Sequence, residues 1–171
     1  MALLKVINYP EPVLLKVGEP VTVFDDELKK LVADMFETMY NAEGVGIAAP
    51  QVNISKRLFV MDVSFGEDEK QKIVAINPEI IHVEGEQIGD EGCLSFPEIF
   101  AKIKRNQRAI MRAQNENGEP FELDGIDLTA RCALHETDHC DGIVFIDRMT
   151  PLKRELAKRK IRKLKRTGVW D

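Results

Sequence analysis

The sequence is poor in the residues that form disulfide frameworks, and it has no long apolar run. Its 171 residues include only three cysteines. An odd number this small cannot build a disulfide framework, so we expect reduced thiols in a reducing compartment. The chain begins without a basic leader and apolar stretch, and no window approaches the roughly 18 apolar residues of a membrane span. We therefore expect a cytoplasmic protein with no membrane partner.

The bulk composition is that of an ordinary globular protein. Hydrophobic residues make up 44% of the chain and charged residues 31%. A chain of this length can bury a core without disulfides. We expect a single domain, with residues 1–150 forming the body that carries the functional site and residues 151–171 forming a basic C-terminal helix of the same domain.

Three segments have the period of helices, and shorter ones are typical of strands. From Asp25 to Asn41 the apolar residues recur at i, i+3, i+4, i+7 and i+8, and Asp25 can cap this helix. Further helices are predicted over 127–141 and 151–166. Runs rich in β-branched residues predict strands at 57–63, 72–76, 79–83, 109–112 and 121–123. The pattern predicts an α+β fold, with small antiparallel or mixed sheets packed around a central metal-binding helix and with a C-terminal helix.

The central helix carries the most specific chemical pattern, His-Glu-Thr-Asp-His at residues 135–139. Residues four apart lie on one face of a helix, so the two imidazoles can bind one metal ion. Glu136 can then reach a metal-activated water as a general base. Leu128 and Cys132 share the face of the histidines, which we expect to point inward. The pattern predicts a metal-dependent hydrolase.

The two histidines leave a third protein ligand to be identified. Zinc peptidases with this motif use a histidine six residues after the second one, or a glutamate on a later helix. Phe145 stands at the first of these positions, and Glu155 lies among basic residues as a solvated charge would. Cys93 follows a segment, 86–90, that reads as a polar turn, and a glycine beside it lets backbone approach a metal. Cys132 competes with Cys93, and spacing alone leaves both open.

A glycine-rich segment over residues 44–51 superficially matches the dinucleotide fingerprint G-x-G-x-x-A. That interpretation fails because a helix precedes the segment and Pro50 blocks the helix that should follow. A strand that lets a substrate backbone lie close to it is the better interpretation. Gln51, at its end, can donate an amide N–H to a developing oxyanion.

Together these segments resemble the motifs of the peptide deformylase family. Gly-Val-Gly-Ile-Ala-Ala-Pro-Gln at 44–51 is similar to the first motif, Glu-Gly-Cys-Leu-Ser at 91–95 to the second, and residues 135–139 to the third. Their order and separations agree, and the resemblance covers essentially the whole chain. It implies a metal-dependent hydrolase that removes the N-formyl group from the N-terminal methionine of newly made polypeptides and releases formate.

The resemblance also implies a ligand set and a metal. Cys93, His135 and His139 would hold one divalent ion and leave a fourth position for water. Family members are natively iron(II) enzymes that also accept zinc, nickel or cobalt. Iron and zinc share these ligand types, so the sequence does not distinguish between them.

For catalysis, the resemblance assigns Glu136 as general acid and base. Gln51 and the backbone N–H of Leu94 would hold the oxyanion. The substrate would lie extended along the strand of Val45 and Gly46, pairing main chain to main chain.

The methionine side chain of the substrate would enter an apolar pocket that uses Leu128 and Cys132. This gives Cys132 a role other than that of a ligand. The chain departs from the residues usual in the family at a few positions that bear on side-chain preference and on support of the site, namely Phe100, Arg131, Leu134 and Cys140.

The C-terminal helix is strongly basic. Between Lys153 and Arg166 lie nine Lys or Arg and one acid, a local net charge of +8 in a chain of −5, so the remainder carries −13. A basic helix can bind ribosomal RNA through phosphate contacts, as in some bacterial deformylases. A solvated charged face is the alternative, and the sequence leaves both open.

Two other functions fit parts of the pattern. A metallopeptidase would use the same helix, but the expected downstream ligand is missing. A ribosome-associated binding protein could hold a purely structural metal, but such a site needs neither Glu136 nor Gln51. A deformylase accounts for all three motifs.

Overall fold

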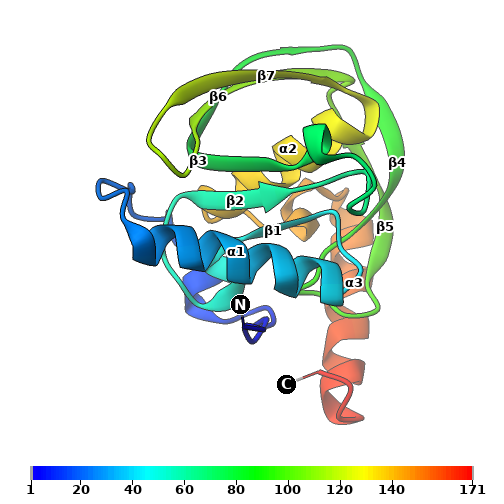
Figure 1. Cartoon of the computed structure of the whole chain (residues 1–171). Coiled ribbons are helices and arrows are strands. Elements are labelled where there is room, and N and C mark those ends of the chain that lie inside the picture. The colour runs from blue at the N-terminus through cyan, green and yellow to red at the C-terminus, as the bar shows by residue number, and fades with distance from the viewer. Residues whose placement is uncertain (1, 171) are drawn as a thin grey trace.

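An antiparallel sheet of five strands lies at the centre of the computed structural model, which describes residues 2–170 (Figure 1). The strands follow the order β1-β2-β3-β6-β7. Their bounds are Gly46–Ala48 for β1, Leu58–Met61 for β2, Ile73–Glu84 for β3, Arg108–Gln114 for β6 and Pro120–Ile126 for β7. A separate antiparallel pair is formed by β4, Gln87–Gly92, and β5, Phe100–Arg105. The prediction of an α+β fold with small antiparallel sheets is confirmed.

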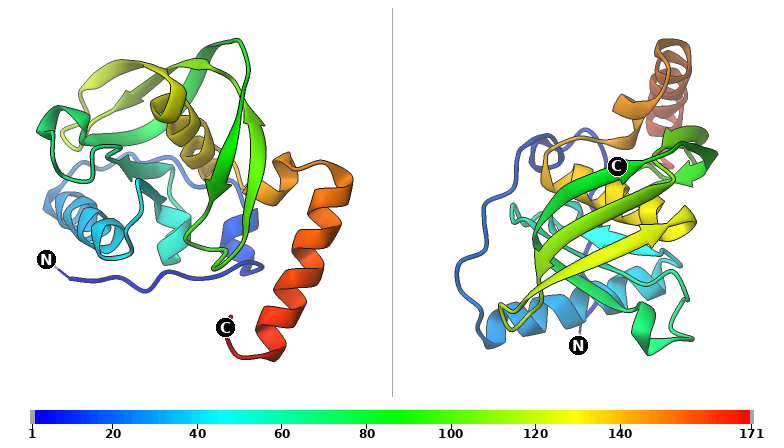
Figure 2. Two further views of the ribbon diagram at one scale, coloured as in Figure 1. Left: turned by 90° about the vertical axis from the view of Figure 1, so that its right-hand side faces the viewer. Right: turned by 90° about the horizontal axis from the view of Figure 1, so that it is seen from above.

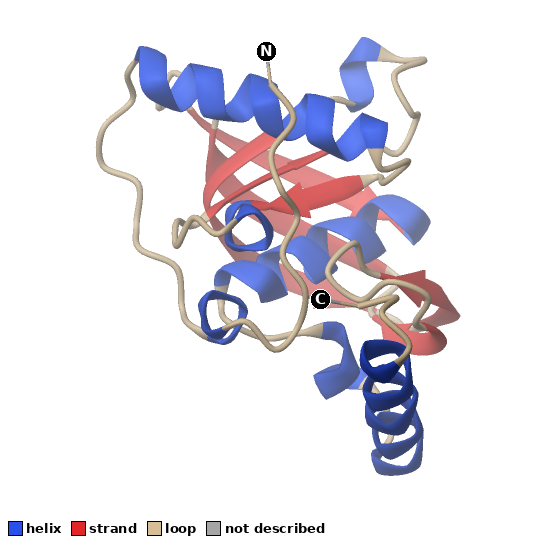
Figure 3. Ribbon diagram, turned by 90° about the horizontal axis from the view of Figure 1, so that it is seen from below, coloured by secondary structure: helices blue, strands red, loops and turns tan. Residues whose placement is uncertain are grey.

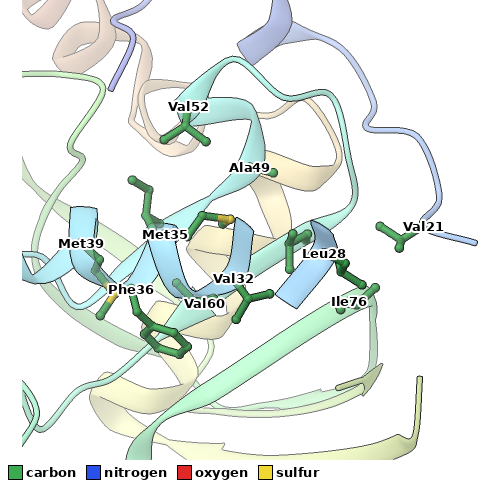
Figure 4. Close-up of a cluster of buried hydrophobic side chains, with 12 residues drawn as sticks. Val21, Leu28, Val32, Met35, Phe36, Met39, Ala49, Val52, Val60 and Ile76 are labelled. Carbon is green, nitrogen blue, oxygen red and sulfur yellow. The ribbon is translucent and has the colours of Figure 1, made fainter. Parts of the chain in front are cut away.

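The first helix, α1, covers one side of the sheet. It spans Asp26–Asn41, and the side chain of Asp25 accepts a hydrogen bond of 3.0 Å from the backbone N–H of Leu28, as an N-cap does. Its apolar stripe packs on β2 and β3 in a cluster of fully buried side chains (Figure 4). That cluster includes Leu28, Val32, Met35, Met39, Val60 and Ile76. The predicted helix over 25–41 is therefore confirmed.

The second helix, α2, is buried on nearly all sides. It spans Asp127–Cys140 and packs against all five strands of the central sheet (Figure 3). Small residues such as Ala130 and Ala133 let the strands approach it closely. Gly142 follows with a φ of +74°, and a Cβ there would lie 2.7 Å from the backbone of Lys16, so only glycine fits this turn. The helix is thus the central element that the sequence predicts.

The third helix, α3, stands out at one side of the molecule (Figure 2). It spans Pro151–Arg166, begins with proline and is capped by Thr150, whose side chain accepts a hydrogen bond from the backbone N–H of Lys153. Only Ala157 and Ile161 of this helix are buried. Across residues 2–170, no helix is both long and apolar enough to cross a membrane.

Single turns of 3-10 helix join the larger elements. They are η1 at Pro12–Leu15, η2 at Ala49–Val52, η3 at Glu69–Gln71 and η4 at Phe145–Arg148. Two of them matter for the site. The η2 turn directly follows β1, and η4 joins the segment after α2 to α3.

Two predicted strands, 72–76 and 79–83, form one strand, β3. The sequence favours two strands because asparagine followed by proline, at residues 77 and 78, is typical of turns. In the structure Asn77 has a φ of +53°, and its side chain bonds to both the backbone N–H and the carbonyl of Val21. The strand continues past this point with a shift in its register with β6.

The prediction of a polar turn over 86–90 is wrong. The strand at 100–105 was not predicted. Residues 87–92 form β4, which pairs with β5 along its whole length. The inward face of this hairpin carries the charged pair Glu91 and Arg105, while Ile88 is exposed. In β4 this alternation is the reverse of the usual apolar-inside pattern, so periodicity could not identify that strand. In β5 the usual pattern is confined to Ile103, which is buried between the exposed Lys102 and Lys104.

Candidate metal centre

Cys93, His135 and His139 converge where the end of β4 meets α2. One ligand atom from each residue lies within 4.8 Å of the other two. The Sγ of Cys93 is 3.3 Å from Nε2 of His139, and the two imidazoles meet edge to face with centroids 5.0 Å apart. A thiolate and two imidazoles suit iron(II), zinc and related divalent ions. These residues therefore fit a single divalent metal.

Local structure explains this convergence. The histidines are one helical turn apart on α2, so both rings leave the same face. Cys93 comes immediately after β4, in a turn closed by a 2.9 Å hydrogen bond from the N–H of Phe96 to the carbonyl of Cys93. A Cβ on Gly92 would lie 2.6 Å from the exposed ring of Phe100 across the hairpin, so a side chain at this position would have to displace that ring.

A buried carboxylate, Glu91, orients the first histidine. Its Oε2 lies 2.7 Å from Nδ1 of His135, which leaves Nε2 of that ring facing the candidate site. Arg105 binds both oxygens of Glu91, at 3.0 and 2.7 Å, and Arg131 donates to Oε1 at 2.9 Å. Burial by itself raises the pKa of Glu91, but the hydrogen bonds from His135 and Arg105 outweigh it and hold the pKa well below its usual range.

The network extends to a second carboxylate on α2. Asp138 accepts a 2.7 Å hydrogen bond from Arg105 and two, at 3.0 and 2.8 Å, from Arg148 in η4. Glu91, Arg105 and Asp138 were not predicted as parts of the site, and Arg131 was noted only as a departure from the residues usual in the family. The one sequence signal that could have pointed to this network was the position of Glu91, directly before the Gly-Cys pair of the 91–95 motif.

Glu136 lies beside the candidate site and is buried. Its Oε2 is 4.0 Å from Nε2 of His135. Its Oε1 has no hydrogen-bond partner among the described residues. Burial raises the pKa of Glu136 to about 7, against the opposing charge of His135. A buried carboxyl group with a free oxygen can take up and release a proton.

Gln51 presents its amide nitrogen to the same point. Its Oε1 accepts a hydrogen bond of 2.9 Å from the N–H of Ala48, so its orientation is determined. The Nε2 then lies 3.5 Å from Sγ of Cys93 and 3.3 Å from Oγ of Ser95. Leu94, whose backbone N–H is the other expected oxyanion donor, lies between Cys93 and Ser95 in the sequence and lines the adjoining pocket.

A pocket of about 500 Å³ opens onto Cys93, His135 and Glu136. The four residues expected to bind substrate all line it, namely Val45, Gly46, Leu128 and Cys132. Leu128 lines this pocket as expected but is not buried, since it is 48% exposed. Its position near the start of α2 leaves it only partly covered by the body of the molecule.

Gly46 and Cys132 form part of the pocket wall. A Cβ on Gly46 would lie 2.8 Å from Oε2 of Glu136 and 2.9 Å from Sγ of Cys132, so this strand can pass the helix only as glycine. Burial and the nearby Glu136 raise the pKa of Cys132 well above its usual value. Its Sγ lies 3.6 Å from the carbonyl oxygen of Val45. Cys132 is therefore a neutral thiol in the wall.

Comparisons with known proteins agree with this geometry. The family model described as polypeptide deformylase matches residues 3–155. The chain is 54% identical over 170 residues to a peptide deformylase of Acidobacterium capsulatum, which covers 99% of this chain and 100% of that protein. It is 46% identical over 169 residues to a peptide deformylase of Chromobacterium violaceum, again covering 99% of this chain and 100% of that protein.

Solved structures show the same similarity. A peptide deformylase from Legionella pneumophila superposes with a TM-score of 0.90 at 43% identity, covering 99% of each chain. That of Thermotoga maritima has a TM-score of 0.81 at 45% identity and covers 87% of this chain and 99% of the other.

Replacing Glu91 tests the energetic role of the buried network. We expect Glu91→Leu to lower the free energy of unfolding by about 3–5 kcal/mol, because Arg105 and Arg131 lose their buried partner. The control is Glu122→Leu, which breaks an exposed pair with Arg112 and should cost at most about 1 kcal/mol. Denaturant unfolding measures both values. Equal losses in the two variants would contradict the buried role.

Proposed function

The chain belongs to the polypeptide deformylase family, whose metal-dependent members remove the N-formyl group from newly made polypeptides, and we propose here how its own residues perform that reaction. Cys93, His135 and His139 hold one divalent metal. The observation that carries this proposal is the approach of their three ligand atoms to within 4.8 Å of one another.

We propose iron(II) as the native metal, with zinc, nickel or cobalt as substitutes. A thiolate and two imidazoles accept all four ions, and availability often decides among ions of similar preference. The hydrogen bond from His135 to Glu91 supports the site in each case, because it holds the ring in the tautomer that leaves Nε2 free.

Glu136 serves as the general base and acid in this proposal. A metal held by the three ligands would supply Lewis acidity for the hydrolysis. Glu136 takes up the proton of the attacking water through its unpaired Oε1 and passes it to the departing amine. Its burial and its pKa of about 7 suit a group that must both accept and donate a proton.

Gln51 and Leu94 stabilise the oxyanion formed from the formyl carbonyl. The bond from Ala48 to Oε1 of Gln51 turns its Nε2 toward Cys93 before substrate arrives. A donor that is already oriented needs no reorganisation during the reaction. The backbone N–H of Leu94, next to Cys93, is the second proposed donor.

The substrate peptide lies along β1 as an added strand. In the five-stranded sheet β1 is an edge strand that pairs only with β2, so its other edge can bind an extended backbone at Val45 and Gly46. The methionine side chain enters the pocket between Leu128 and Cys132. The neutral thiol of Cys132 contributes an apolar surface to that pocket.

We propose that residues 1–150 carry catalysis and that the C-terminal helix, residues 151–171, docks the enzyme on ribosomal RNA. The ends of these ranges, Met1 and Asp171, lie outside the described residues. The exposed face of α3 carries most of its lysines and arginines, which supports phosphate contacts. Docking would place the enzyme in the cytoplasm beside emerging formylated peptides.

Replacing Glu136 tests the proton transfer. We expect Glu136→Ala to lower formate release from a formyl-methionyl peptide by about 10²–10⁴-fold, because it removes the group that is proposed to carry the proton. Metal content should stay at one ion per chain. Glu155→Ala, on the exposed face of α3, is the control and should release formate at the normal rate. An active Glu136→Ala enzyme would refute the assignment.

Two cysteine variants test the ligand set. We expect Cys93→Ala to weaken metal binding by more than the roughly 10–100-fold that loss of an outer partner costs, since it removes a ligand itself. Cys132→Ala should keep one metal per chain and change mainly KM. Metal analysis after dialysis against a weak chelator measures both. The reverse pattern would assign the ligand role to Cys132.

Three exposed arginines of α3 test ribosome docking. Arg159, Arg162 and Arg166 recur at i, i+3 and i+7 and thus lie on one face. Changing all three to Gln should weaken ribosome binding and reduce the slope of log affinity against log salt by about 1 for each lost phosphate contact. Formate release from a free peptide should not change. Unaltered ribosome affinity would favour a merely solvated helix.

A further inference from the structure

Trp170 is the chain's only tryptophan, and it folds back onto the body of the molecule after α3. Gly168 makes the turn with a φ of +80°, which favours glycine. The backbone N–H groups of Val169 and Trp170 then bond to the carbonyl of Leu164, at 3.0 and 3.3 Å. As a result the indole is only 3% exposed.

The indole contacts the turn that follows Cys93. Its Nε1 donates a 2.7 Å hydrogen bond to the carbonyl oxygen of Pro97. Its ring meets the ring of Phe96 edge to face, with centroids 5.7 Å apart. Phe96 in turn packs on Phe145, at a centroid distance of 4.9 Å, in a cluster that Cys93 also contacts.

The N-terminal segment holds the same turn from another direction. The N–H of Tyr9 donates a 3.0 Å hydrogen bond to the carbonyl of Ser95. The ring of Tyr9 stacks on Phe96 with centroids 4.9 Å apart. Segments from near both ends of the chain therefore hold residues 95–97, only two to four positions after Cys93.

We propose that Trp170 is a positioning residue for Cys93, an inference that rests on the proposed role of Cys93 as a metal ligand. Cys93 lies outside β4, so no ladder hydrogen bonds hold it in place. Its position depends on the turn to Pro97, and the indole supplies that turn with a hydrogen bond and an aromatic contact. A turn that is already fixed leaves Cys93 less conformational entropy to lose when it binds the metal. Metal binding is therefore tighter.

Metal dissociation from two Trp170 variants tests this role. With zinc-loaded enzyme and excess chelator, Trp170→Ala should release metal faster by about 10-fold, the lower range for a supporting partner. Trp170→Phe keeps an aromatic contact but has no N–H donor, so its rate of metal release should lie between those of the wild-type enzyme and Trp170→Ala. Val169→Ala is the matched control, because this neighbouring side chain is 48% exposed. Release at the wild-type rate from a folded Trp170→Ala enzyme would overturn the proposal.

The unmodified enzyme provides a second measurement if Trp170→Ala does not fold. Since Trp170 is the only tryptophan, its fluorescence reports on this contact alone. Removal of zinc by chelator should increase quenching by acrylamide, because a released Cys93 frees the turn and exposes the indole. Identical quenching with and without zinc would overturn the proposal.

The Cys93→Ala variant separates this inference from the proposed function. If Cys93→Ala keeps its metal, the ligand assignment fails and the positioning role fails with it. If Cys93→Ala loses metal while Trp170→Ala releases it at the wild-type rate, only the positioning role is refuted.

Discussion

The contact between the carboxylate of Glu91 and the imidazole of His135 is the interaction on which the rest of the site depends. It joins the short hairpin of β4 and β5 to the central helix at the point where the candidate ligands meet. A carboxylate this deeply buried is stable only if its charge is balanced, and Arg105 and Arg131 balance it. The same contacts that balance the charge of Glu91 therefore fix the position of the hairpin, and of the adjacent Cys93, relative to the central helix.

Close approach of backbone to side chain is the second requirement. Gly46 lets the edge strand pass within contact of Glu136, and Gly92 lets β4 pass under the ring of Phe100. A side chain at either position would displace a group that faces the pocket. Gly46 thus brings the proposed peptide-binding strand and the proposed base together, which a reaction at the first residue of a peptide requires.

The far ends of the chain meet at one turn of the site. Tyr9 and Trp170 both contact Phe96, so the aromatic cluster under Cys93 is complete only when both ends have folded onto it. The basic helix that precedes Trp170 leaves its charged face free for a partner. One C-terminal segment can thereby combine an outward-facing binding surface with an inward-facing support.

The sequence by itself determined the three helices, the histidine pair one turn apart on α2, and the three motifs whose order and spacing resemble those of the deformylase family. These features depend on local spacing, which hydrogen bonding within a helix converts directly into geometry. Spacing alone did not choose between Cys93 and Cys132, and it misread the β4 strand as a turn. Only the tertiary structure brought Cys93 to the histidines and revealed the network around Glu91, because both depend on pairing between strands and on charges from distant segments.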